Sequence, residues 1–201
     1  MIEAGIGRLL VASLHQSIAD LLPTRLEFYE SWLNPAGLRD GRIGLAPLAA
    51  VLSFLRQEGD AYHLVMERAG EYTAEWVMAS MSPMRRTLVR RLPQGLRLPV
   101  ALRLGFELTR QTYKATRASV RVRRGEGTVE IRGSIFCEVR ENTPEPTCAF
   151  YAAAYRRLLA EFDLDTAVDI ARCRATGDGH ACALVVRATR ADGATGPGRR
   201  S

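Results

Sequence analysis

Apolar residues recur with a helical period through the first half of the chain. They lie three or four positions apart along one side of each segment, while charged and polar residues occupy the other side. Pro23 interrupts the first segment, and the Asn-Pro-Ala-Gly sequence at 34–37 is typical of a turn. The pattern predicts helices over residues 6–33 with a break at Pro23, and over 45–57, 61–81, 84–92 and 100–113.

The period changes to two near residue 117. Residues 119–123 alternate, the Gly-Glu-Gly sequence at 125–127 indicates a turn, and apolar or small residues occupy every second position from Val129 to Val139. This pattern predicts a β-hairpin with one buried face. An amphipathic helix follows from about Thr147, and residues 167–173 and 182–187 are predicted to form a second hairpin.

The order of helices, hairpin, helix and hairpin predicts an α+β fold rather than a parallel, doubly wound sheet. We expect N-terminal helices packed on a small antiparallel sheet of two hairpins separated by a helix. The chain has 201 residues, 47% hydrophobic and 25% charged, which suffices for one core and not for two. Residues 1–189 are therefore predicted to form a single domain, and residues 190–201, which lack apolar periodicity, a disordered tail.

The charged residues limit which cellular compartment and which binding partners we expect. Arg8, His15 and Asp20 interrupt the apolar stretch near the N-terminus, so we expect no secretory signal, no membrane span and a cytoplasmic location. The net charge of +6 is almost entirely due to arginine, but no nucleic-acid-binding motif accompanies it, so nucleic acid is not an expected partner. Four arginines within positions 85–91 have helical spacing and suit a solvated helix face, with contact to an anion or a membrane surface as the alternative.

Two short sequences near the C-terminus carry a family resemblance. Cys148-Ala-Phe-Tyr151 begins the last predicted helix, and Cys173-Arg-Ala-Thr-Gly-Asp178, followed by Cys182, belongs to the last hairpin. Over residues 147–186 the chain resembles the closing part of the 4-vinyl reductase (hydrocarbon-binding) domain family. The last two cysteines are nine positions apart, one more than in the family pattern.

The resemblance implies the fold of the small trafficking-complex subunits of the Bet3 type, which are often dimeric and enclose an apolar cavity. The Phe136-Cys137 pair and the start of the last helix look most similar to the subfamily associated with bacteriochlorophyll synthesis. We expect a symmetric homodimer formed through the N-terminal helices, because their apolar surface exceeds what the small sheet can cover.

The cysteines are candidate metal ligands, since structural disulfides are rare in a reducing cytoplasm. Cys148, Cys173 and Cys182 have the family positions, and a hairpin brings the last two face to face, so that three thiolates can hold a structural Zn²⁺. His180 in the turn is the candidate fourth ligand, because Asp169 lies about 13 Å from Cys173 along a regular strand. Cys137 falls on the apolar strand face and is assigned to the core. The alternative is that these cysteines are buried thiols without a metal.

The sequence predicts binding rather than catalysis. It contains no G-x-S-x-G, no phosphate-binding loop and no dinucleotide-binding fingerprint in its required context, and no catalytic residue is assigned. The predicted function is that of a carrier or sensor for a hydrophobic, aromatic or tetrapyrrole-like molecule, with a place in bacteriochlorophyll synthesis implied by the resemblance. A vinyl reductase or accessory enzyme of tetrapyrrole metabolism is one alternative, and a structural interaction subunit is another.

A ligand cavity is expected between the helices and the sheet. Gly133 leaves room on the sheet face, and Gly105 with Arg103 and Arg110 is expected to admit and orient an acidic group of the ligand. The alternative is that the aromatic residues simply fill the core. The candidate ligand-binding residues are Trp76, Phe106, Tyr113, Tyr151 and Tyr155.

Overall fold

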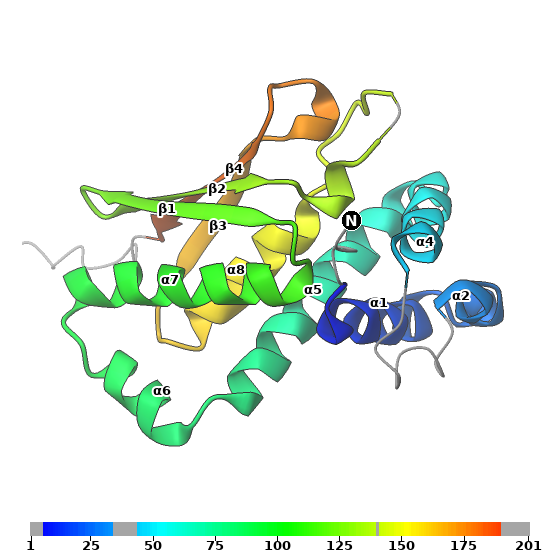
Figure 1. Cartoon of the computed structure of the whole chain (residues 1–201). Helices are drawn as coiled ribbons and strands as arrows, with labels where there is room; N and C mark the ends of the chain where they lie inside the picture. Colours follow the sequence, from blue (N-terminus) through cyan, green and yellow to red (C-terminus); the bar gives the residue numbers. More distant parts are fainter. Residues whose placement is uncertain (1–5, 34–43, 140, 190–201) are drawn as a thin grey trace, which may run out of the picture.

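The computed structural model describes residues 6–33, 44–139 and 141–189 (Figure 1). Within these ranges the chain has the predicted α+β architecture, with helices on one side of an antiparallel sheet. The predicted turn at 34–37 and the predicted tail at 190–201 lie outside the described residues.

The helices follow the apolar periodicity closely. Pro23 divides the first predicted segment, because it begins a short 3₁₀ turn between α1 and α2. Ser82 caps α6, its hydroxyl accepting a hydrogen bond from the Arg85 amide at 3.4 Å. The last helix before the sheet begins earlier than predicted and runs through Pro99. The α-helices are α1 (Arg8–Leu21), α2 (Leu26–Leu33), α4 (Leu45–Gln57), α5 (Asp60–Ser80), α6 (Pro83–Arg90), α7 (Gln94–Thr112) and α8 (Ala149–Ala160).

The two hairpins join into one antiparallel sheet in the order β1-β2-β4-β3. The strands are β1 (Arg117–Arg123), β2 (Glu126–Arg132), β3 (Thr166–Arg172) and β4 (Cys182–Ala188). The first hairpin turns at Arg124 and Gly125, which have φ values of 50° and 82°, so that both turn residues have the positive φ of a type I′ turn. β2 pairs with β4 in a register that places Val129 opposite Leu184 and Ile131 opposite Cys182.

The second strand is shorter than the sequence pattern predicts. We expected it to continue to Val139, but it ends at Arg132, and the next residue, Gly133, has a φ of 65°. A 3₁₀ turn, η2 (Ile135–Cys137), follows and directs the chain out of the sheet. Gly133 therefore leaves no space on the sheet face, because it stands beyond the end of the strand.

The helices form layers beneath the sheet. α7 contacts β1 and α8 contacts β3, while α5 packs on α8 and α1 packs on α5 (Figure 1). The first seven residues of α8 are all buried, which makes it the central helix of the core. Gly70 lets the α5 backbone approach α8, since a Cβ there would lie 2.2 Å from the Phe150 carbonyl oxygen.

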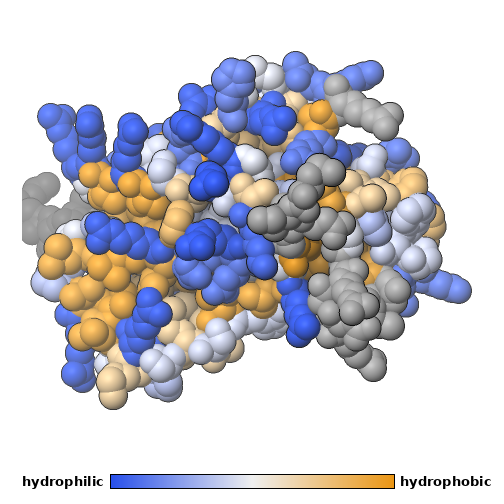
Figure 2. All heavy atoms as spheres, viewed as in Figure 1, coloured by the Kyte–Doolittle hydropathy of each residue, from blue (hydrophilic) through white to orange (hydrophobic). Residues whose placement is uncertain are grey.

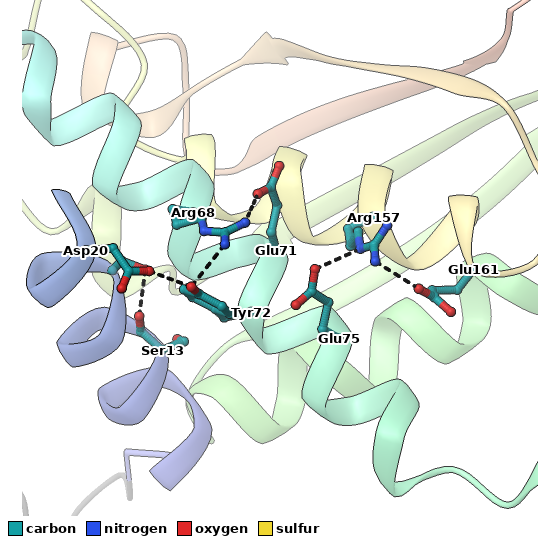
Figure 3. Close-up of polar contacts among 9 residues, drawn as sticks. Ser13, Asp20, Arg68, Glu71, Tyr72, Glu75, Arg157 and Glu161 are labelled. Atoms are coloured by element: carbon teal, nitrogen blue, oxygen red, sulfur yellow. Dashed lines mark hydrogen bonds and ion pairs between the residues drawn. The ribbon is translucent and has the colours of Figure 1, made fainter.

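Polar contacts fix α5 between its two neighbours (Figure 3). The Tyr72 hydroxyl of α5 donates a hydrogen bond to Asp20 of α1 at 2.5 Å, which lowers the pKa of that carboxyl group. On the other side, Arg157 of α8 pairs with Glu75 of α5 at 3.1 Å and with Glu161 at 3.2 Å. These contacts are partly solvated, so they orient the helices more than they stabilise the fold.

Candidate metal centre and ligand pocket

The four cysteines of the chain converge at one end of the sheet. Their sulfur atoms all lie within 4.8 Å of one another, and all four residues are buried. The shortest separations are 3.3 Å between Cys137 and Cys182, 3.5 Å between Cys148 and Cys173, and 3.6 Å between Cys137 and Cys173. We refer to these four residues as the cysteine cluster. No two of them form a disulfide bond.

The dimensions of the cysteine cluster suit a tetrahedral zinc ion. Four sulfurs at the usual Zn–S distance of about 2.3 Å lie about 3.8 Å apart along each edge of the tetrahedron. The observed separations, from 3.3 Å to at most 4.8 Å, lie on both sides of this value. A set of four thiolates is typical of structural zinc sites and fills the coordination sphere, so no position is left open for a substrate.

Each cysteine reaches the cluster from a different element. Cys182 begins β4 and Cys173 directly follows β3, so the second hairpin supplies two sulfurs, as the sequence predicts. Cys148 precedes the first residue of α8, which ties the central helix to this hairpin. Cys137 ends the 3₁₀ turn η2, which carries the chain from the end of β2 toward the same point.

Neighbouring donors are placed to stabilise thiolates. The backbone amide of Arg174 points at the Cys182 sulfur over 3.5 Å, and the buried hydroxyl of Thr147 points at the Cys137 sulfur over the same distance. Donors of this kind orient metal ligands and favour their charged form. A hydrogen bond with Cys148 lowers the pKa of the Cys137 thiol to about 7 and one with Cys137 lowers the pKa of Cys173, whereas hydrogen bonds with Cys137 raise the pKa of Cys148 and Cys182. The four sulfurs therefore share their protons when no metal is bound.

The identity of the fourth sulfur corrects the sequence analysis. Cys137 was assigned to the core because it fits the alternating pattern of the preceding strand, but the end of β2 at Arg132 takes it out of that pattern. His180 does not join the cluster. It is exposed in the β3–β4 connection, beyond the reach of the buried sulfurs. Gly133 is the residue from which the position of Cys137 could have been predicted, because a glycine within an alternating pattern often marks the point where a strand is interrupted.

Two of the predicted ligand-binding residues are packed inside the protein. Tyr151 and Tyr155 of α8 are fully buried, and the Tyr155 hydroxyl lies 3.2 Å from that of Thr109. Gly105 of α7 accommodates this ring, since a Cβ at that position would lie 2.3 Å from Tyr155 Cε1. Gly105 therefore permits close packing between α7 and α8, and it is not the ligand entrance that we expected.

The other three predicted residues lie apart from one another. Tyr113 is buried at the end of α7, and Trp76 stacks on Tyr72 with ring centroids 5.5 Å apart. Phe106 is half-buried and lines a surface pocket with Arg110, whose guanidinium lies 5.9 Å from the ring centroid. Of the pockets described here, only the one beside Arg110 is lined by any of the five aromatic residues, namely Phe106.

A pocket with a volume of about 480 Å³ lies at the opposite end of β4 from the cysteine cluster. It is bounded by the start of α7, the β1–β2 turn, the α8–β3 connection and the end of β4. The hydroxyl oxygen of Thr166 is buried and has no hydrogen-bond partner among the described residues. The lining residues are Gly95, Leu98, Val122, Gly125, Asp163, Leu164, Asp165, Thr166, Ala188 and Thr189.

The pocket combines an apolar wall with a small number of polar groups. Leu98 and Leu164 supply buried apolar surface, while Asp163 and Asp165 supply carboxylates. Small-molecule sites commonly have volumes of about 300–1,000 Å³ and a lining of this kind. The exposed carboxylates of Asp163 and Asp165 are the polar groups that a ligand would meet, because the Thr166 oxygen is buried within the wall.

Comparison with models of known protein families gave no match, and comparison with curated proteins gave none either. The described helices include none with the length and apolar character needed to cross a bilayer.

Proposed function

We propose that the protein is a carrier or sensor that binds a hydrophobic, aromatic or tetrapyrrole-like small molecule in the pocket beside Thr166. The observation that carries this proposal is a 480 Å³ pocket whose wall combines the apolar side chains of Leu98 and Leu164 with a few polar groups. An apolar body would fill the space against Leu98 and Leu164, and a hydrogen-bond donor would meet the exposed carboxylates of Asp163 and Asp165.

We further propose that the cysteine cluster holds one structural Zn²⁺. The sulfur separations support this assignment, as does the burial of all four side chains. Three of the four cysteines also carry the resemblance to the 4-vinyl reductase domain family, so the cluster supports membership of that family.

Ligand binding is tested by fluorescence titration of the zinc-loaded protein with naphthalene, Nile red and protoporphyrin IX. Gly95→Trp places an indole at the pocket without a backbone clash, because a Cβ at Gly95 has no neighbouring atom within 4 Å. This variant should weaken binding of the preferred probe at least tenfold.

The matched control is Leu64→Trp, which adds the same side chain at an exposed position of α5 outside the pocket. This control should bind like the wild type. If Gly95→Trp binds every probe as tightly as the control does, the pocket is not the ligand site. Consumption of NADPH in the presence of a vinyl chlorophyllide would instead indicate the reductase alternative.

A further inference from the structure

Large apolar side chains project from the end of the molecule formed by α6 and the start of α7. Met84 is 83% exposed, Leu88 is 64% exposed and Leu96 is 57% exposed. Met84 and Leu88 are four positions apart in α6 and therefore lie on the same side of that helix. The opposite side holds the helix in place through the buried Val89. Figure 2 shows hydrophobic surface over this end, bordered by hydrophilic side chains.

The segment that carries these side chains has charge of one sign, and the nearby Asp163 is paired with Arg90 of α6 at 3.6 Å. Positions 76–106 contain six arginines and neither aspartate nor glutamate. Arg85 and Arg91 each stand three positions from Leu88, so they flank the apolar stripe. Both are exposed, and neither forms an ion pair with any described residue. We refer to Met84, Arg85, Leu88, Arg91 and Leu96 as the basic apolar patch.

We propose that the basic apolar patch docks the protein on the surface of an anionic membrane. A helix that lies in the bilayer interface buries apolar side chains among the acyl chains while cationic side chains remain at the phosphates. The long arginine side chains suit this arrangement, because their methylene groups extend along the apolar layer and their guanidinium groups reach the headgroups. Because this stretch contains no aspartate or glutamate, it has no carboxylate that would repel the phosphates of anionic lipids.

The two features together favour lipid over other anionic partners. A nucleic acid would use the arginines but would leave the most exposed side chains, Met84 and Leu88, in contact with phosphates or water. These side chains project from a short convex helix, and a fluid lipid layer can surround them without a preformed complementary groove. Charge complementarity and the shape of the apolar stripe are thus both satisfied by an anionic bilayer.

Docking in this way would also place the proposed ligand pocket near the bilayer. Gly95 and Leu98 line that pocket, and Leu96 of the basic apolar patch lies in the same helical turn. A hydrophobic ligand could then move between the membrane and the pocket without crossing bulk water. This consequence rests on the proposed function, whereas the docking itself rests on the basic apolar patch alone.

The test is co-sedimentation of the full chain with vesicles of phosphatidylcholine, with and without phosphatidylglycerol. We expect binding to the anionic vesicles only, decreasing as salt is added. Arg85→Gln with Arg91→Gln should weaken binding about 25-fold, since each arginine near an anionic surface contributes about fivefold (about 1 kcal/mol). Met84→Ser with Leu88→Ser should weaken it about tenfold or more.

Matched controls use exposed residues of the same types elsewhere. Leu64→Ser on α5 and Arg121→Gln on β1 should bind like the wild type, and circular dichroism should show that every variant is folded. The proposal is overturned if anionic vesicles do not bind, or if the Met84/Leu88 variant binds as well as the wild type. It is also overturned if duplex DNA binds more tightly than the vesicles and does so independently of Met84 and Leu88. Ligand titration without vesicles tests the pocket separately.

Discussion

Replacing Cys137 with serine tests which residues bind the metal. The observed cysteine cluster includes Cys137, whereas the ligand set expected from the sequence has His180 in its place. The substitution removes one of four buried sulfurs and leaves a hydroxyl that does not ionise at neutral pH. Structural zinc in small domains contributes an apparent free energy of about 10–16 kcal/mol. One ligand in four therefore corresponds to about 3 kcal/mol, which is a large part of the 5–15 kcal/mol that stabilises a typical domain.

The assay is zinc content by mass spectrometry together with urea unfolding, each with and without a chelator. Wild-type protein should contain about one zinc per chain. Cys137→Ser should bind zinc about 150-fold more weakly and, with zinc in excess, should lose about 3 kcal/mol of unfolding free energy. His180→Ala is the matched control, because His180 is the fourth ligand that sequence spacing favours. It should keep both its zinc and its stability. In the chelator, wild type and Cys137→Ser should differ by only about 1 kcal/mol, because neither then holds the metal.

Two results would refute this reasoning. Wild-type protein without zinc, whose stability does not change after chelation, would show that the four thiols form an ordinary part of the core. Zinc retained by Cys137→Ser and lost by His180→Ala would show that the metal is bound elsewhere than in the cluster of four sulfurs. Either result would leave the fold unchanged and would remove the metal from the cysteine cluster.

Three further predictions concern packing and assembly. Gly105→Ala should lower the unfolding free energy in urea by about 1–3 kcal/mol, because its Cβ would meet the immobile ring of Tyr155. Tyr62→Phe should cost about 1–3 kcal/mol, since its buried hydroxyl donates a hydrogen bond to the Thr147 carbonyl oxygen at 2.7 Å. Light scattering should give twice the 22.2 kDa chain mass, and Trp32→Glu, which changes a 40% exposed side chain of α2, should shift the mass toward the monomer.

The elements could be predicted from the sequence because their signals are local. The helix over residues 45–57 and the second hairpin appear where the apolar period places them. Both signals come from contacts within a few residues, so they do not depend on the rest of the fold. The predicted strand end was wrong at Gly133, because apolar residues continue to alternate in the sequence after the strand has ended. Alternation describes the residues that could share a face, and it does not show whether the backbone stays extended.

The ligand pocket could not be predicted from composition. Aromatic residues that line a cavity and aromatic residues that fill a core have the same spacing along a helix, and α8 uses Tyr155 for the second purpose. The pocket instead depends on Gly95, Thr166 and chain connections that meet only in the folded protein. Such a site arises from the ends of several elements, and no single segment of the sequence carries its pattern.

The arrangement of the two sites restricts what the proposed metal can do. β4 begins at the cysteine cluster and ends at the pocket, and its seven residues span about 20 Å. α8 also begins at the cluster and leads to the pocket, and its 12 residues span about 18 Å. A metal bound by Cys148 and Cys182 is therefore too far away to touch a ligand beside Thr166. It would act by fixing the starting points of the helix and the strand whose far ends shape the pocket, so ligand affinity should depend on zinc through the stability of this scaffold and not through chemistry at the ion.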